Sequence, residues 1–440
     1  MGQGMDAQQP RDAVPYSRGY VLWAIGLIFV VSMLNVVDRT IVALLVPGIQ
    51  ADLGLSDIQL GLLLGPSFSV VHFLAVVPLA WLADRTVRRN VIAVGLFAWS
   101  LMTMLGGVAQ NFFQLFATRM GVGIGEAAGS PPAVSLLSDT APESQRARAL
   151  SAVTIGALTG IGAGMLIGGY VSEHYGWRTA LVVVGAPGIA VSFLVRLTLR
   201  EPPRRQAANA DPVTAARHLF RLPSFSWMAA ATCLGGVGGL GRSLWEPTFL
   251  YRVYDFSGIE VGAWYFAINA LPAAAGAYLG STLSDRLSER DPRWALWICA
   301  IGNGAAFPFL AAFLLWPESH AVSVVGISVP VAFGFSALGS VFSGFFSPPA
   351  GAVAQSLARP DMRAMAHAFW TMLMTLVGMG LGPFLVGALS EYLGQDYGVN
   401  SIRYALLIAS VTLPLSSLLF LRAARNLRED LARIEGQGKN

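Results

Sequence analysis

Charged side chains inside apolar stretches are the residues of this chain that could do chemistry. Arg119 and Glu126 lie seven positions apart in the apolar segment 113–138. A charge in hydrocarbon costs at least about 2.5–3.5 kcal/mol on insertion scales, so chains rarely carry one without a use for it. Seven residues at about 100° each bring Glu126 to within about 20° of the helix face of Arg119, about 10 Å along the axis. We therefore predict that both side chains face one cavity inside a helix bundle.

Two further pairs of charged residues lie in apolar stretches. Asp38 and Arg39 are adjacent, so their side chains point about 100° apart along a helix and only one can face the cavity squarely. They could instead form a structural ion pair or lie at the water boundary. Arg242 and Glu246 are spaced i, i+4, on one helix face. Arg39 and Arg242 would place one cation from each half of the chain, which would suit one anionic head group. Alternatively, Arg242 and Glu246 could lie near the outer boundary and pair only with each other.

A carboxyl group beside a guanidinium can link proton binding to anion binding. When ionised, Glu126 or Asp38 would neutralise Arg119 or Arg39. When protonated, it would leave the guanidinium free to bind an anionic head group in bidentate fashion. Such a linkage requires no cofactor.

Other chemistry finds little support in the sequence. His72 is a lone imidazole, for which a packed, hydrogen-bonded role is favoured over a proton relay. The sequence contains no Walker loop, zinc-ligand spacing or nucleophile elbow, and the glycines from Gly121 to Gly125 follow no predicted strand. We therefore expect neither an enzyme nor a metal protein.

The composition is that of a membrane protein. Of the 440 residues 54% are hydrophobic and only 12% are charged, and the mean hydropathy is +0.58; soluble domains carry about 25% charged residues. The isoelectric point near 9.2 does not indicate nucleic-acid binding, because the basic residues are almost all arginines scattered between apolar segments. Cys233 and Cys299 lie in apolar segments and are expected to be free thiols. Residues 1–19 are polar, so we expect no cleaved signal peptide.

Twelve apolar segments are long enough to cross a bilayer. They cover residues 20–46, 57–82, 90–110, 113–138, 147–173, 178–199, 225–251, 259–283, 294–316, 321–348, 363–390 and 402–422. Most arginines lie in the terminal tails and even-numbered loops, whereas the odd-numbered loops hold only Arg178, Arg252 and Arg403. The positive-inside rule then predicts cytoplasmic termini. Short loops and a near absence of lysine favour a bacterial inner-membrane protein, which we expect to be a monomer.

The chain divides into two similar halves. Ser130-Pro-Pro-Ala133 recurs as Ser347-Pro-Pro-Ala350, 217 residues later, in corresponding segments. Parallel six-helix repeats are typical of transporters. The predicted fold is an all-α membrane protein with twelve transmembrane helices in two pseudo-symmetric six-helix bundles. Its predicted parts are a cytoplasmic tail (1–19), an N-terminal bundle (20–198), a cytoplasmic linker (199–222), a C-terminal bundle (223–422) and a cytoplasmic tail (423–440).

The loop between the second and third segments carries a charged motif. Ala80-Trp-Leu-Ala-Asp-Arg-Thr-Val-Arg-Arg89 resembles the signature of the major facilitator superfamily, with Ala80 in place of its glycine. Asp285 and Arg286 repeat its Asp-Arg step in the second half. The resemblance implies a conformational latch formed by Asp84, Arg85, Arg89, Asp285 and Arg286. The alternative is ordinary positive-inside charge.

Three further motifs bear on which family of the superfamily the chain resembles. The glycines of Gly160–Gly169 resemble the antiporter motif of the superfamily, although Met165 replaces its proline, and plain helix packing explains them as well. The Asn-x-x-Asp-Arg pattern ending at Arg39, and the Arg-x-x-x-Gly-x-Gly-Glu-Ala pattern from Arg119 to Ala127, resemble the Spinster family within that superfamily. This resemblance is strong over residues 20–200 and thin beyond them.

The family resemblance, and nothing in the composition, implies a substrate class. It implies a proton-coupled transporter that moves amphipathic anions such as lysophospholipids or sphingoid phosphates by alternating access, with the bilayer and the small cargo as its partners. The expected driving force is a proton gradient, with no cofactor; symport or antiport and the proton stoichiometry stay open. A drug/proton antiporter or an organic-anion or sugar carrier is the alternative. A hydrophobic-cation pump should tolerate loss of Arg119, whereas a phosphate-bearing cargo should need it. A receptor would normally carry a soluble signalling domain, which this sequence does not indicate. A channel would need a continuous polar stripe along the spans, and the sequence indicates none.

Overall fold

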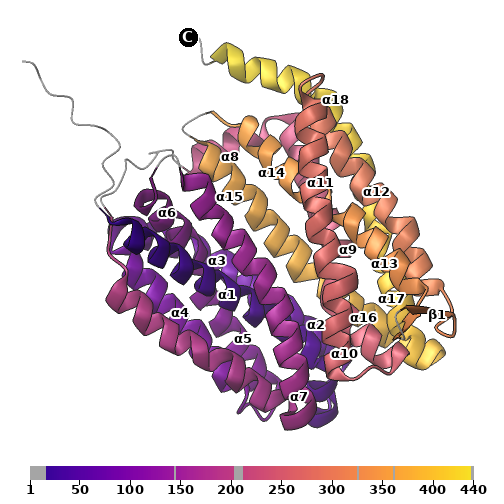
Figure 1. Cartoon of the computed structure of the whole chain (residues 1–440). Coiled ribbons are helices and arrows are strands. Elements are labelled where there is room, and N and C mark those ends of the chain that lie inside the picture. The colour runs from indigo at the N-terminus through magenta and orange to yellow at the C-terminus, as the bar shows by residue number, and fades with distance from the viewer. Residues whose placement is uncertain (1–15, 143–144, 203–211, 325–326, 360–361, 438–440) are drawn as a thin grey trace, which may run out of the picture.

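The computed structural model describes residues 16–142, 145–202, 212–324, 327–359 and 362–437, which form two helical bundles side by side (Figure 1). Helix α1 begins, and α18 ends, at one end of the molecule, which we call the termini face. The opposite end, where α1 ends and α2 begins, we call the distal face. The predicted N-terminal tail up to residue 15, and 203–211 of the predicted linker, lie outside the described residues.

Within the described residues, the first bundle comprises seven α-helices that make six crossings. They are α1 (Arg18–Leu53), α2 (Asp57–Leu64), α3 (Pro66–Arg85), α4 (Arg88–Gly106), α5 (Phe112–Ala127), α6 (Ser130–Thr140) and α7 (Arg146–Thr198). Helix α7 makes two of these crossings, because the chain turns back at Gly176. Its φ of +83° is the left-handed conformation that glycine adopts without strain.

The second bundle follows the short helix α8 (Pro212–Phe220). Its elements are α9 (Pro223–Tyr254), α10 (Gly258–Tyr265), η2 (Phe266–Ala270), α11 (Leu271–Ser288), α12 (Trp294–Leu315), β1 (Ala321–Val324), β2 (Ile327–Pro330), α13 (Ala332–Gly344), α14 (Ser347–Ser356), α15 (Arg363–Leu373), η4 (Met374–Met379), α16 (Gly380–Tyr397), η5 (Gly398–Asn400), α17 (Ser401–Ser410) and α18 (Thr412–Gln437).

Across the described residues these elements make twelve crossings, as the sequence predicts. Several crossings are interrupted. The fourth and tenth each break before a Ser-Pro-Pro sequence that starts a new helix, α6 and α14. Proline suits this position because the first turn of a helix leaves its N–H groups unbonded in any case. By length and composition alone, six described helical segments could cross a membrane, and two of these, 148–198 and 365–434, contain two crossings each.

The tenth predicted segment begins later than the sequence indicates. The strands β1 and β2 pair in antiparallel fashion at the distal face, and the membrane helix begins only with α13. The alternating Ala-Val-Ser-Val and Ile-Ser-Val-Pro sequences favour extended strands, because β-branched side chains pack well on a pleated surface. Hydropathy alone does not separate such strands from the start of a span. At the other end of this half, α18 continues as one helix to Gln437, through the region predicted as a tail.

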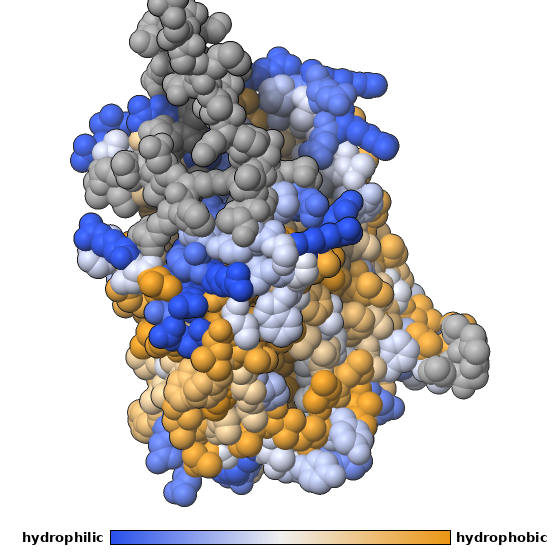
Figure 2. Space-filling model, turned by 60° about the vertical axis from the view of Figure 1, so that its left-hand side comes forward, coloured by the Kyte–Doolittle hydropathy of each residue, from blue (hydrophilic) through white to orange (hydrophobic). Residues whose placement is uncertain are grey.

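Apolar residues lie both on the surface that would face lipid and in the interior of the molecule. On the face shown in Figure 2, apolar residues form a broad band between two polar ends, as a bilayer requires. Inside, one hydrophobic core joins both bundles and includes Leu60 and Val46 of the first with Trp245 and Val386 of the second. A separate core near the termini face belongs to the second bundle and α8 alone. The bundles are therefore packed together towards the distal face.

Candidate functional site

A cluster of buried charges lies in the first bundle, formed by side chains of α1 and α5. Glu126 is fully buried, and Asp38 and Arg119 are 2% and 5% exposed. Nε of Arg39 donates a hydrogen bond of 2.6 Å to Oε2 of Glu126. The Arg39 guanidinium also lies over the ring of Phe68, 4.8 Å from its centroid. The structure therefore brings together four of the residues singled out in the sequence, two cations and two acids.

Arg119 is the least satisfied member of this cluster. Its Nε and Nη1 atoms are buried and have no hydrogen-bond partner among the residues that the structure describes. Oδ1 of Asp38 and Oε1 of Glu126 are likewise buried and have no hydrogen-bond partner in the described part of the chain. Electrostatic interactions link Arg119 to both carboxyl groups. An unsatisfied buried polar group costs about 1–3 kcal/mol, and more when charged, so the cluster is suited to take up a further partner.

The glycines between Arg119 and Glu126 explain how the charges become buried. A Cβ on Gly123 would lie 2.8 Å from the carbonyl oxygen of Phe68, and one on Gly125 would lie 2.7 Å from the backbone nitrogen of Trp99. Only glycine permits these approaches, so α5 packs closely against both α3 and α4. The two charged side chains are thereby held inside the bundle and away from lipid.

A small cavity borders the cluster. Its volume is about 20 Å³, room for about one water. Asn35 of α1 lines it and also lies beside Glu126. The other lining residues come from α1, α4, α6 and α7 or precede α6: Val31, Ser32, Trp99, Gly129, Ala133, Val134 and Val153. The cavity therefore lies between helices of the first bundle, and neither Arg119 nor Glu126 is among the residues that line it.

His72 of α3 packs beside the cluster rather than within it. Its ring stacks on Phe68 with centroids 5.1 Å apart. Its Nδ1 lies 3.2 Å from the carbonyl oxygen of Gly123, at hydrogen-bond distance. This geometry is that of the packed, hydrogen-bonded histidine that the sequence analysis favoured.

The predicted residues of the second half form a separate cluster. Arg242 bonds to Glu246 on the same helix, and its Nη2 lies 3.5 Å from Oγ of Ser340. Glu246 also accepts hydrogen bonds from Asn269 of η2, at 2.7 Å, and from Ser336 of α13, at 3.3 Å. Both charged residues are buried. The carboxylate of Glu246 is therefore bound from three elements and neutralises Arg242 within the second bundle.

The predicted latch residues are mostly exposed. The side chain of Asp84 lies outside the described part; Arg85 stacks on Trp81, 4.0 Å from the ring centroid, and Asp285 and Arg286 are exposed. Arg89 donates to the carbonyl oxygen of Leu199 at 2.8 Å. No geometry here joins the two copies of the motif within the described residues.

Arg88, which the sequence analysis did not select, is a buried hub of hydrogen bonds. It is 3% exposed and donates to Asp139 of α6 at 2.6 Å, to Glu201 at 2.7 Å and to the carbonyl oxygen of Pro202 at 3.2 Å. It therefore ties the segment after α7 to the termini face of the first bundle. Its place in the motif was visible in the sequence, but its partners, which also include Ser135, lie 47 to 114 positions away, so no local pattern marked it.

The glycines of α7 serve two packing seams. A Cβ on Gly160 would lie 2.4 Å from the carbonyl oxygen of Met33 in α1, within the first bundle. A Cβ on Gly169 would lie 2.4 Å from that of Gly258, at the start of α10 in the second bundle. The motif therefore permits close packing both within one half and between the two halves.

Comparison with known proteins agrees with this architecture. Residues 28–337 match the model of the Major Facilitator Superfamily. An "MFS-type efflux pump" of Mycolicibacterium smegmatis is 33% identical over 93% of this chain and 94% of its own length. "Protein spinster homolog 3" of Danio rerio is 28% identical over 95% of this chain and 87% of its own length.

A solved structure gives the same result. A bacterial homologue of the human lysosomal transporter Spinster, in an inward-facing and unoccupied conformation, superposes with a TM-score of 0.83 at 26% identity, over 94% of this chain and 99% of the homologue. The fold and the buried charge cluster are thus those of a multi-pass membrane transporter and not of an enzyme. The chain belongs to the major facilitator superfamily, as a Spinster-like member.

Proposed function

We propose that this chain is a proton-coupled secondary transporter that moves amphipathic anions, such as lysophospholipid- or sphingoid-phosphate-like lipids, by alternating access. The observation that carries the proposal is Arg119, a guanidinium buried in the first bundle with two N–H groups that lack a partner among the described residues. A phosphate or carboxylate head group would satisfy both N–H groups in bidentate fashion.

Proton coupling would arise from the acids beside Arg119. While Glu126 and Asp38 are ionised, they balance the charges of Arg119 and Arg39. Protonation of either acid leaves one positive charge in excess, which favours entry of an anion. Glu126 would be the more direct coupling residue, because it bonds to Arg39 and interacts with Arg119. Proton binding and anion binding would then be linked.

The roles of Arg242 and Glu246 in cargo binding stay a prediction. Their bonds to each other, and those of Glu246 to Asn269 and Ser336, favour a structural role instead. We therefore assign coupling and anion binding to the first bundle. The latch function of Asp84, Arg85, Arg89, Asp285 and Arg286 also stays a prediction, for a state in which the termini faces of the two bundles meet.

The arrangement of the bundles supports an alternating-access cycle. Their shared core lies towards the distal face. With both termini cytoplasmic, as the arginine distribution predicts, this packing corresponds to an inward-facing state. The similar Spinster homologue is also described as inward-facing. We further propose a bacterial inner-membrane location, a monomer, and a proton gradient as the driving force without a cofactor.

A drug/proton antiporter is the second candidate, and one observation favours it. The relative that is 33% identical carries the name "MFS-type efflux pump". A pump for hydrophobic cations would use the acids Asp38 and Glu126 for both cargo and proton, and the positive charge of Arg119 would not help it. The two candidates therefore differ in their need for Arg119.

Transport into proteoliposomes tests the proposal. The cargoes would be a lysophospholipid, a sphingoid phosphate and a cationic dye, each assayed with and without a pH gradient. For the anionic cargoes we expect Glu126→Gln to remove the response to the gradient and Arg119→Ala to lower transport by at least about tenfold, the equivalent of one lost charge-assisted hydrogen bond. Dye transport that survives Arg119→Ala, with no transport of either lipid by the wild type, would establish the antiporter. Wild-type proton dependence in Glu126→Gln would remove Glu126 from coupling.

A further inference from the structure

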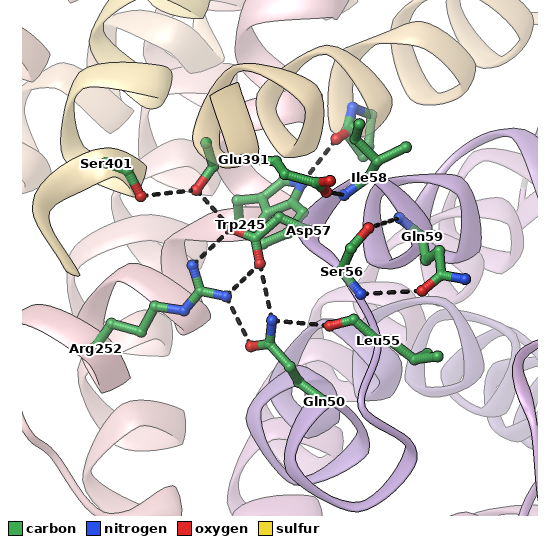
Figure 3. Close-up of polar contacts among 12 residues, drawn as sticks. Gln50, Leu55, Ser56, Asp57, Ile58, Gln59, Trp245, Arg252, Glu391 and Ser401 are labelled. Carbon is green, nitrogen blue, oxygen red and sulfur yellow. Dashed lines mark hydrogen bonds and ion pairs between the residues drawn. The ribbon is translucent and has the colours of Figure 1, made fainter. Parts of the chain in front are cut away.

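Four polar side chains from both bundles meet at the distal face (Figure 3). Arg252 of α9 binds Asp57 of α2 through two hydrogen bonds, Nη2–Oδ1 at 2.5 Å and Nη1–Oδ2 at 2.9 Å. Gln50 of α1 accepts from Arg252 at 2.8 Å and donates to Asp57 at 3.0 Å. Ser390 of α16 donates to Asp57 at 2.6 Å. We call these four residues the distal lock.

The distal lock joins the two halves and is shielded from water. Gln50 and Asp57 belong to the first bundle, whereas Arg252 and Ser390 belong to the second. The side chains of Arg252 and Asp57 are 19% and 10% exposed. A bidentate, largely buried arginine–carboxylate pair is among the stronger polar interactions in proteins, and removing one partner leaves the other charge unpaired.

Local structure fixes the position of Asp57. It is the first residue of α2, where Ser56 and Gln59 form a capping box by bonding to each other's backbone N–H groups. The next backbone N–H, that of Ile58, donates to Glu391 of the second bundle at 2.8 Å. The carboxylate of Asp57 is thus held at a rigid helix start rather than on a loop.

The internal repeat shows that this joint is built differently from its counterpart. Ile259, at the start of α10, donates to Glu173 of α7 at 3.2 Å, which mirrors the bond from Ile58 to Glu391. Ser257 and Glu260 likewise form a capping box. The residue that corresponds to Asp57 is Gly258, which packs directly against the backbone of Gly169. Of these two described joints, only the one between α2 and α16 therefore carries the arginine–aspartate pair.

We propose that the Asp57–Arg252 pair, oriented by Gln50 and Ser390, is the lock that holds the distal faces together and sets the population of the inward-facing state. The distal faces can separate only when both hydrogen bonds of this pair break. These residues position the two bundles and do not contact cargo. The inference rests on the alternating-access part of the proposed function and is independent of the cargo and of proton coupling.

Distances between two spin labels across the distal face test the lock. Labels at Ala51 in the first bundle and Val399 in the second would be attached in a variant with Cys233 and Cys299 replaced by alanine. None of these four substitutions changes a residue of the distal lock. In Arg252→Ala we expect the ratio of long-distance to short-distance populations to rise at least about tenfold, as loss of one partner of a buried charge pair implies.

A matched control exists in the first bundle. Arg178 bonds to Asp52, again an arginine–aspartate pair at the distal face, but both residues belong to the same half. Arg178→Ala should leave the distance distribution unchanged. Charge exchange in Asp57→Arg/Arg252→Asp should restore most of the short-distance population, and Arg252→Lys, which keeps the charge but loses the bidentate geometry, should give an intermediate result.

The outcomes decide the proposal separately from transport of any cargo. A wild-type distribution in both Arg252→Ala and Arg252→Lys would overturn it, as would an equal shift in Arg178→Ala. If Arg252→Ala does not purify as a folded protein, Arg252→Lys and the charge exchange still decide. If the lock variants shift the distances but neither lipid is transported by the wild type, the cargo assignment fails and the lock stands.

Discussion

Glu246 is a buried carboxylate whose main task, from its contacts, is to neutralise Arg242. We expect Glu246→Ala to lower the free energy of unfolding by about 3–5 kcal/mol, because it leaves a buried guanidinium without its partner. The double variant Arg242→Leu/Glu246→Leu should recover most of that loss, since an apolar pair of similar volume needs no neutralisation. Chemical or thermal unfolding in detergent would measure both.

Transport by that double variant separates stability from cargo binding. If it is stable and still moves cargo, the pair is structural. A stable double variant without transport would instead support the original prediction that Arg242 binds the head group. Full stability of Glu246→Ala would contradict the pairing described above.

At the scale of single residues, the sequence predicted which charges would be buried but not which would bond. Spacing along one helix places Arg119 and Glu126 in the same direction, and both are indeed buried. The bond of Glu126, however, goes to Arg39 on α1. The pairing depends on how closely α1 approaches α5, and that distance is a property of tertiary packing, which no spacing within one helix contains.

Among the elements, α7 makes two kinds of contact through one glycine stripe. We expect Gly160→Ala to lower the free energy of unfolding by about 1–3 kcal/mol, because its Cβ would press on α1 inside one bundle. Gly169→Ala should instead increase the population with separated distal faces, because its Cβ would press on α10 of the other bundle. Melting temperatures and the distances between labels at Ala51 and Val399 would distinguish these effects. Equal behaviour of the two variants would contradict this assignment of the seams.

The loop between α11 and α12 is fastened to α18 by a titratable group. Hydrogen bonds from Arg293, and then from Arg428 of α18, lower the pKa of Asp291 to about 2, from a usual value of 3.8. A depressed folded-state pKa stabilises the protein above the unfolded-state pKa, and this contribution is lost as the pH falls towards 2. We expect the melting temperature of the wild type to exceed that of Asp291→Asn at about pH 6, and the gap to narrow between about pH 4 and pH 2. A gap independent of pH would contradict this.

Element positions could be predicted better than element breaks. The twelve crossings of the described residues follow from hydropathy, but the predicted start of the tenth was wrong, because two strands rich in valine, isoleucine and serine do not stand out from the apolar residues of a span. The π-helical segments η2 and η4 had no sequence signal either. Such segments form where packing against neighbouring helices favours an extra residue per turn, and that condition depends on the neighbours.

For the whole molecule, the repeat in the sequence predicted the two-bundle fold, because each half must bury its polar groups in the same way within the bilayer. The conformation could not be predicted. It depends on a free-energy difference between two packings of the same helices, and the distal lock brings together residues from Gln50 to Ser390. A few hydrogen bonds among such distant residues can decide that balance while leaving the hydropathy pattern unchanged.

The anchoring of Pro202 by Arg88 has one further consequence. The carbonyl group of Pro202 is fixed to the first bundle, and α8, which starts at Pro212, is packed into the core of the second through Ala215 and Leu219. Ten residues of fully extended chain span at most roughly 35 Å. The covalent chain thus acts as a tether of fixed reach, so the termini faces of the two bundles can move apart only by a distance that the length of the linker limits.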